Sequence, residues 1–385
     1  MSAEATADAT ATATGAGVDR AGRIVVKIGS ALLIDDGTGA LRRDWLRSFA
    51  GDVARMRGRG QEVAIVSSGA IAFGRRQLGL TGQALALEEK QAAAAVGQIH
   101  LAHAWQEALA AHELTLAQVL LSLADTEERR RHLNARETLS QLFGFGAVPL
   151  INENDTVATE EIRFGDNDRL AARVAQMVSA DLLVLLSDID GLYDRDPRQY
   201  GDARHIPDVG ALTDEVRAMA GKPRPGYSSG GMVTKLEAAR IAVGAGCAMI
   251  VSDGRAEHPI RRLEAGERHT RFAPAAGPGT ARKRWIAGAL GGDARITVDA
   301  GAANALRRGK SLLPAGVTMV GGNFRRGDAV RIVGPDGAEI AIGLIAYDAD
   351  AARKIAGRQS REIEALLGYK GRDVLVHRDD MVERE

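Results

Sequence analysis

Several short stretches place glycines, hydroxyls, amides or charges directly after apolar runs, where a strand would end. The fullest is INENDTVATEEIRFGDND (151 to 168), which holds six acids and three asparagines in eighteen residues. A helix cap needs one such residue and contributes about 1 kcal/mol. Like charges crowded together repel unless a cation, a donor or a ligand amine offsets them. We therefore favour a binding site over an acidic surface loop; its candidate residues are Asn152, Glu153, Asn154, Asp155, Asn167 and Asp168.

Two lysines lie beside glycines in stretches that suit a phosphate. Lys27 lies in VVKIGSALL, just before Gly29 and Ser30, although an edge lysine before a tight turn explains that stretch alone equally simply. Lys235 lies in PGYSSGGMVTKLEAARIA (225 to 242), where a Ser/Gly segment runs into a helix. Glycines let backbone approach a ligand, and helix N-termini and ammonium groups attract anions. The second stretch is the most specific single signal in the chain.

Two further strand ends are candidates, and several common motifs are missing. VAIVSSGAIAFG places Ser67, Ser68 and Gly69 at a helix start, which suits a carboxylate or phosphate but also an ordinary serine cap. LLLSDIDGLYDRDPR places Ser187 and Asp188 at a strand end. The P-loop pattern fails at NALRRGKS because Asn304 replaces its first glycine, and no zinc-spaced Cys/His set or G-x-S-x-G elbow occurs. A phosphate site without a P-loop is implied.

The elements that must position these residues alternate between strands and helices. Apolar runs predict strands at 23–28, 62–66, 116–121, 147–151, 182–187 and 248–252. Helical periodicity predicts helices near 43–58, 88–112, 132–143, 167–179 and 232–244. This alternation is typical of an α/β fold, a mainly parallel sheet between helices, whose ligands sit beyond the carboxyl ends of the strands.

The pattern changes towards the C-terminus. RFAPAAGPGTARKRW resembles a linker, and RITVD, GDAVRIVG, EIAIGLIAY and DVLVH predict short strands, with a short helix at DADAARKIAG. We expect a disordered tail at 1–20, an α/β domain at 21–270, a linker at 271–291 and a small β-rich domain at 292–385. The Ala/Thr-rich tail has neither a signal-peptide nor a transit-peptide pattern.

Composition excludes some classes of partner. The 385 residues include 50 basic and 50 acidic side chains, so no global field draws the chain to nucleic acid or membrane. Its single cysteine, Cys247, permits no intramolecular disulfide and indicates a reducing, cytoplasmic compartment; a buried small hydrophobe is the simplest role for it. No apolar run approaches the ~18 residues that a membrane helix needs.

The motifs together resemble the glutamate 5-kinase (γ-glutamyl kinase) family of the amino acid kinase superfamily. The resemblance rests, in order, on KIGSALL, VSSGAIAFG, KQAAAAVGQ, LNARETL, PLINENDTVATEEIRFGDND, SDIDGLYDRDPR and SGGMVTKL. It continues through RKRWIAGAL, ITVDAGAANAL, GNFRRGDAVRI and YKGRDVLVHRDDM, which resemble that family's C-terminal PUA domain. The resemblance implies an amino acid kinase fold followed by a PUA domain.

The resemblance also implies roles for individual residues. Lys27 and Lys235 match the lysines that contact the ATP phosphates and the transferring phosphoryl group, and Asp168 matches the acid that orients them. Glutamate-binding positions are matched by Ser68, Asp155 and Asn167. Nucleotide contacts are matched by Lys27, Gly29, Ser187, Asp188, Ser229, Gly230, Gly231, Met232, Val233, Thr234 and Lys235, with Ser229 and Val233 standing where threonine and serine are common.

The implied reaction transfers the γ-phosphoryl group of Mg-ATP to the side-chain carboxylate of L-glutamate, the first step of proline biosynthesis. Mg²⁺ would be held largely by phosphates and water, without a protein metal site. The resemblance implies feedback inhibition by proline, a homo-oligomer, and channelling of the product to glutamate-5-semialdehyde dehydrogenase.

Two alternatives stay open. A sister enzyme would phosphorylate N-acetylglutamate, aspartate, carbamate or UMP; a free-amine site around Asp155 argues against an acylated substrate. An RNA-binding protein is the other, because PUA-like domains occur in such proteins. Residues 293–385 hold 15 Lys/Arg and 14 Asp/Glu, a net charge of +1, and RNA binding usually needs a concentrated basic face. We therefore rank RNA binding below a regulatory or assembly role for this domain.

Overall fold

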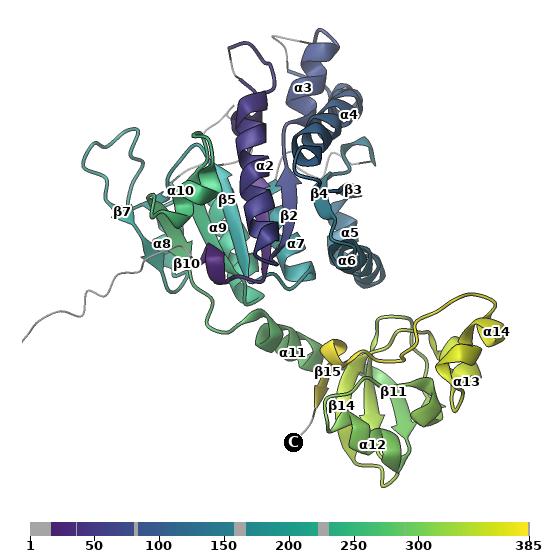
Figure 1. Ribbon diagram of the computed structural model, residues 1–385. Helices are drawn as coiled ribbons and strands as arrows, with labels where there is room; N and C mark the ends of the chain where they lie inside the picture. Colours follow the sequence, from purple (N-terminus) through teal and green to yellow (C-terminus); the bar gives the residue numbers. More distant parts are fainter. Residues whose placement is uncertain are drawn as a thin grey trace, which may run out of the picture. The chain divides into compact units, whose positions relative to one another are not determined.

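The computed structural model describes residues 17–35, 37–80, 84–157, 167–221, 231–288 and 290–383 (Figure 1). They form two compact units. The first comprises the described residues within Met1–Glu127 and Ala135–Pro278, and the second comprises Glu128–Asn134 and the described residues within Gly279–Glu385.

An eight-stranded sheet organises the first unit, in the order β3-β4-β2-β1-β5-β9-β10-β8. Neighbouring strands in it run parallel except for β9 and β10, which are antiparallel. The strands are β1 (Arg23–Ile28), β2 (Glu62–Ser67), β3 (Leu116–Leu121), β4 (Val148–Glu153), β5 (Leu182–Ser187), β8 (Asp208–Val209), β9 (Ala248–Asp253) and β10 (His269–Phe272). The predicted mainly parallel sheet is confirmed, with all six predicted strands in it.

The edge strands β8 and β10 were not predicted. They are two and four residues long, and runs that short carry no clear alternation of apolar and polar residues. Strand β10 reaches Phe272, a fully buried residue, and so extends into the stretch that the glycines and prolines mark as a linker.

Helices cover both faces of this sheet. On one face lie α1 (Ser30–Leu33), α2 (Arg43–Gly58), α4 (Leu87–Ala110) and α10 (Pro259–Glu264). On the other lie the C-terminal part of α6 (Arg129–Gly144), α7 (Asn167–Met177) and α9 (Met232–Gly244). Figure 1 shows α2 on the near face of the sheet, with α3 (Ala70–Gln77) beside α4. The unit also holds α5 (Leu123–Glu127), α8 (Asp214–Ala218), the 3-10 turn η2 (Asp155–Val157) and a small hairpin of β6 (Leu192–Tyr193) and β7 (His205–Ile206).

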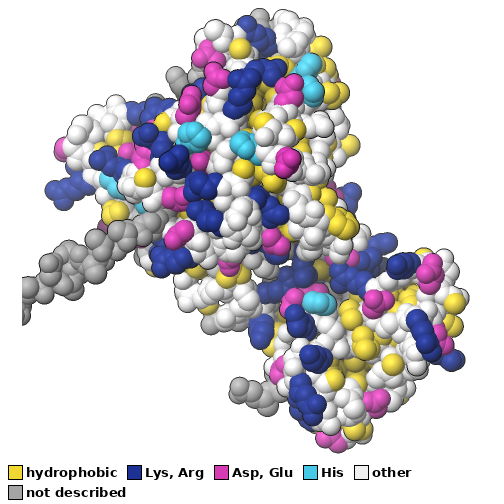
Figure 2. All heavy atoms as spheres, in the orientation of Figure 1, with side chains coloured by type: hydrophobic (Ala, Val, Ile, Leu, Met, Phe, Trp, Pro, Cys, Tyr) yellow, Lys and Arg dark blue, Asp and Glu magenta, His cyan; other side chains and the backbone are white. Residues whose placement is uncertain are grey.

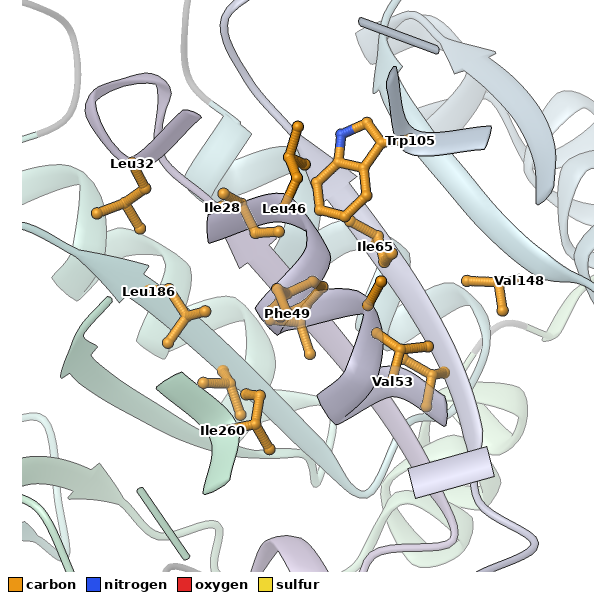
Figure 3. Packing of buried hydrophobic residues seen from close by; sticks show 14 of the residues in the cluster. Ile28, Leu32, Leu46, Phe49, Val53, Ile65, Trp105, Val148, Leu186 and Ile260 are labelled. Carbon is orange, nitrogen blue, oxygen red and sulfur yellow. The ribbon is translucent and has the colours of Figure 1, made fainter. Parts of the chain in front are cut away.

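The alternation of side chains along β1 decides where its lysine lies. Ile24, Val26 and Ile28 enter the core beneath α2, whereas Val25 enters the opposite core beneath α7 and α9. Successive strand residues point to opposite faces, so Lys27 shares the face of Val25 and points towards α7 and α9. Figure 3 shows the first of these cores, with Phe49 and Val53 of α2 packed over the sheet.

The second unit is built on a five-stranded sheet in the order β12-β11-β13-β14-β15. Its strands are β11 (Leu290–Val298), β12 (Val317–Gly321), β13 (Ala329–Val333), β14 (Glu339–Leu344) and β15 (Met381–Glu383), with helices α11 (Pro278–Gly288), α12 (Ala300–Leu306), α13 (Ala349–Ile355) and α14 (Ile363–Leu367). The predicted β-rich character is confirmed. A strand at DVLVH is wrong: Val376 makes only an isolated bridge with Leu312, because both Leu375 and Val376 are buried in the core rather than alternating between two faces.

Two expectations about the rest of the chain have clear outcomes. The prediction of disorder is wrong for the last residues of the stretch 1–20, because Val18–Arg20 form a 3-10 turn in which Val18 is fully buried and its carbonyl oxygen accepts from Gln61 at 2.6 Å. Cys247 is buried in the core under α9, and this burial raises the pKa of its thiol, so it behaves as a small hydrophobe. None of the helices in the described ranges combines the length and the apolar character needed to cross a membrane.

Candidate active site

Two buried lysines meet at one buried aspartate. Asp168 is in the first turn of α7 and is 2% exposed. Its Oδ1 lies 2.6 Å from Nζ of Lys27 on β1, and its Oδ2 lies 3.3 Å from Nζ of Lys235 in the first turn of α9. Helices α7 and α9 pack against each other over the same face of the sheet. The fold therefore brings together two ammonium groups that are more than 200 residues apart in the sequence.

The charges of this cluster stabilise one another. Burial alone would raise the pKa of Asp168, but the adjacent ammonium groups of Lys27 and Lys235 outweigh burial and hold that pKa at about 2. The hydroxyl of Thr234 lies 2.9 Å from Asp168 Oδ2 and 2.8 Å from the carbonyl oxygen of Gly231. Asp168 thus stays ionised at any ordinary pH, and the cluster as a whole carries a net positive charge that suits an anion.

A chain of amides adjoins the lysine cluster. Nδ2 of Asn167 donates to Oγ of Ser68 at 2.9 Å and to Oδ1 of Asn152 at 3.1 Å. In turn, Nδ2 of Asn152 donates to Oε1 of Gln98 on α4 at 2.6 Å. The Oδ1 atom of Asn167 is buried and has no hydrogen-bond partner in the described part of the structure. A buried acceptor of this kind is costly unless a ligand supplies a donor.

Asp155 begins the turn η2, directly after β4, and is 7% exposed. Within the ranges that the structure describes, its carboxylate has no hydrogen bond and no ion pair. Burial and the nearby charge of Glu153 raise its pKa to about 7. A buried carboxyl group of this kind favours a cationic ligand, because a cation would both replace its lost hydration and lower its pKa.

The candidate nucleotide contacts lie at the carboxyl ends of β1 and β5. The N–H of Gly29 donates to the carbonyl oxygen of Leu186 at 3.4 Å, so it is already used within the sheet. Oγ of Ser187 lies 3.2 Å from Oδ1 of Asp188. Burial by itself would raise the pKa of Asp188. The hydrogen bond that Arg198 donates to it at 2.7 Å has the opposite effect, and the net shift of the pKa is downward.

The Ser/Gly segment before α9 is described only in part. Gly231 is the N-cap of α9, and Met232, Val233, Thr234 and Lys235 form its first turn. Ser229 and Gly230 lie outside the described residues. The same holds for most of TVATEEIRFG, the stretch after Asp155 that has no assigned role.

Sequence reasoning assigned no role to three residues that the structure brings to this region. Asn152 was noted in its acidic stretch but not given a contact, and Gln98 ends KQAAAAVGQ, which contributed only to the resemblance. Arg198, which pairs with Asp188, lies in DRDPR. The acidic stretch marks Asn152 only as a candidate, and nothing local marks Gln98 or Arg198, because each acts through a partner that the fold brings near.

Metal ligands are scarce in this region. Over the described ranges, no group of three or more His, Cys, Asp or Glu side chains could hold a metal ion. Asp168 is occupied by two lysines and a hydroxyl, which leaves its oxygens poorly placed to bind a cation.

The α/β fold and the two lysines paired with Asp168, one on β1 and one in the first turn of α9, are an arrangement typical of a phosphotransferase without a P-loop. The family model described as the amino acid kinase family matches residues 22–253, and the PUA domain model matches residues 294–367. Glutamate 5-kinase of Paramagnetospirillum magneticum is 61% identical over 360 residues, which are 94% of this chain and 97% of that protein. Glutamate 5-kinase of Rhodospirillum rubrum is 58% identical over 358 residues, 93% of this chain and 96% of that protein. The chain belongs to the amino acid kinase family and, within it, to the glutamate 5-kinases.

Proposed function

We propose that this enzyme transfers the γ-phosphoryl group of ATP to the side-chain carboxylate of L-glutamate. The products are ADP and L-glutamyl 5-phosphate, and the reaction begins proline biosynthesis from glutamate. The observation that carries the proposal is the cluster of Lys27, Asp168 and Lys235, next to which Asn167 donates to Ser68. The names of relatives at 58–61% identity support the choice of glutamate.

The chemistry requires positioning rather than proton transfer. A glutamate side chain, with a pKa near 4.3 in water, is ionised at neutral pH, so its oxygen can attack the γ-phosphorus without a general base. That oxygen forms the new P–O bond while the bond to the β-γ bridging oxygen breaks, and ADP leaves. The barrier arises from bringing a carboxylate to a polyanion, and the two ammonium groups of Lys27 and Lys235 offset it.

Asp168 would act as the residue that aligns the two lysines. Each of its oxygens faces one ammonium group, so the pair is held in place before the substrate arrives. Preorganised charge of this kind needs no rearrangement during the reaction. The hydroxyl of Thr234 adds a neutral contact to the same carboxylate.

The amino-acid half of the site would recognise a free amine. Asp155 would pair with the α-ammonium group, Asn167 would accept from the substrate through its Oδ1, which is unpartnered in the described structure, and Ser68 would fix a further polar group. An acylated amine offers no cation to Asp155, which favours glutamate over N-acetylglutamate.

The nucleotide half would combine Lys27, Lys235 and the segment from Ser229 to Thr234 at the start of α9, with Ser187 and Asp188 beyond β5. Because the N–H of Gly29 is used by Leu186, phosphate donors near β1 would come from the backbone after Gly29. Mg²⁺ would arrive with ATP, held largely by phosphates and water. When bound, it would neutralise phosphate charge.

The resemblance supports three further proposals. Proline would inhibit by overlapping the glutamate pocket, the chain would form a homo-oligomer, and its unstable acyl phosphate would be channelled to glutamate-5-semialdehyde dehydrogenase. RNA binding by the PUA unit has less support. In Figure 2, basic side chains are interspersed with acidic ones over much of the visible surface.

One assay tests the function directly. Purified enzyme with Mg-ATP and glutamate should release ADP, and hydroxylamine should trap γ-glutamyl hydroxamate in equal amount. N-acetylglutamate, aspartate and UMP serve as competing acceptors, and preference for any of them over glutamate would refute the proposal. Replacement of Asp155 by Ala should raise the glutamate KM with little change in the ATP KM, whereas equal effects on both would remove Asp155 from the amine site.

A further inference from the structure

We propose that Gln98 is a positioning residue that sets the polarity of the amino-acid site. It lies in α4, outside the strand ends that carry the site, and it faces the chain of amides rather than the lysine cluster. This inference rests on the proposed function, since it concerns how the enzyme recognises the α-ammonium group of its acceptor.

The amide chain has a direction. Gln98 Oε1 accepts from Asn152 Nδ2 at 2.6 Å, which turns Asn152 Oδ1 towards Asn167. Asn152 Oδ1 then accepts from Asn167 Nδ2 at 3.1 Å. Because the nitrogen of Asn167 is used in this way, its Oδ1 is the end of the chain, and it is a buried acceptor without a partner in the described structure.

The direction matters because the ligand is a donor. An ammonium group has N–H bonds to donate and nothing to accept with, so it needs oxygen atoms such as Asn167 Oδ1 and the carboxylate of Asp155. If the amide of Asn152 were reversed, its nitrogen would face the nitrogen of Asn167, and Asn167 would turn to avoid it. The site would then present an NH₂ group to the ammonium and repel it.

The helix that carries Gln98 is packed tightly against α3. The residue before it, Gly97, meets α3 with no room for a side chain: an added Cβ would lie 1.8 Å from the carbonyl oxygen of Ala70. A Cβ added at Gly74 of α3 would likewise lie 1.7 Å from the carbonyl oxygen of Ala93 in α4. These two glycines let α3 and α4 touch backbone to backbone, which fixes where Gln98 meets β4.

The same helix also reaches the neighbouring strand end. Two turns after Gln98, Nε1 of Trp105 donates to Oγ of Ser67 at 3.2 Å, and its ring packs edge-on against Phe49. Helix α4 further packs against η2, the turn that carries Asp155. Helix α4 therefore contacts the ends of β2 and β4 and the turn η2, which carries Asp155. The stretch KQAAAAVGQ, at the start of this helix, thus has a structural role.

The test compares three variants of the full-length enzyme by glutamate-dependent ADP release. Gln98→Met keeps the shape but removes the acceptor, and should raise the glutamate KM about tenfold, the effect of leaving a buried donor unpaired. The ATP KM and kcat should stay within about twofold. Gln98→Glu keeps an acceptor for Asn152 and should recover most of the loss. Gln106→Met, the same change at an exposed site of α4, should behave as the parent.

Three outcomes would overturn the proposal: an unchanged glutamate KM in Gln98→Met, an equal rise in the ATP KM, or a Gln98→Glu variant as impaired as Gln98→Met. The last would show that shape or the Nε2 donor matters, rather than the acceptor. A parent enzyme that forms no hydroxamate with glutamate would refute the proposed function instead, so the two failures are distinguishable.

Discussion

The carboxylate of Asp168 offers the strongest test of how the two lysines are held. Replacement of Asp168 by Asn keeps the size of the side chain but removes its charge. Two ion pairs, at 2.6 and 3.3 Å, are then lost in a buried site. Removing one partner of a buried ion pair typically costs about 3–5 kcal/mol, because the remaining charge is left without compensation.

Catalysis should suffer more specifically than stability. Without the carboxylate, Lys27 and Lys235 repel each other and lose their common anchor, so we expect kcat to fall by about 10²- to 10³-fold, the range seen when one preorganised charge contact is removed. The ATP KM should not rise, because the change removes a negative charge near the phosphates. The pKa of Asp168, about 2, means that this contribution is constant from pH 5 to 9; its stabilising effect is present above the unfolded pKa and is lost only as pH falls towards 2.

Steady-state kinetics and denaturant unfolding would separate the two effects. Asp52→Asn is a matched control, because Asp52 is 1% exposed and accepts from the backbone N–H groups of Ile260 and Arg261, at 2.9 and 3.2 Å, on the other face of the sheet. The control should lose stability but keep kcat. If Asp168→Asn retains kcat within about threefold, or if Asp52→Asn loses as much kcat, the alignment of the lysines by Asp168 is wrong.

Three further predictions follow from the structure. Because the pKa of Asp155 is raised to about 7, kcat/KM for glutamate should rise between pH 6 and 8 as this carboxyl ionises, and Asp155→Asn should flatten that rise; a parallel rise in both enzymes would contradict the assignment. The same raised pKa means that ionisation of Asp155 costs stability above pH 4, so Asp155→Asn should gain thermal stability relative to the parent as pH increases to 8. Gly97→Ala should destabilise the enzyme by about 3 kcal/mol in denaturant unfolding, because its Cβ would overlap the backbone of α3. Gly58→Ala, where an added Cβ meets nothing within 4 Å, should be neutral, and equal losses would show that crowding is not the cause.

The polar residues at strand ends illustrate how far local sequence reaches. Lys27, Ser68 and Asp155 each lie in or after an apolar run, and the rule that ligands bind beyond the carboxyl ends of parallel strands made them candidates, whereas Asp168 was a candidate because of the crowded polar stretch. The rule gives the edge of the sheet but not the neighbours. The distance of 2.6 Å between Lys27 and Asp168 depends on the order β2-β1-β5 and on α7 lying over the face that Lys27 shares with Val25.

The sequence by itself determined the six central strands, the main helices and the chemical types gathered at the strand ends, because periodicity and composition act over a few residues. The tertiary structure decided which of those residues touch. It placed Gln98 of α4 against Asn152 of β4, far apart in the chain, and it made Asn167 end the amide chain with an unpartnered oxygen. Such contacts depend on sheet order and helix packing, and these are set by the free energy of the whole fold rather than by any one segment.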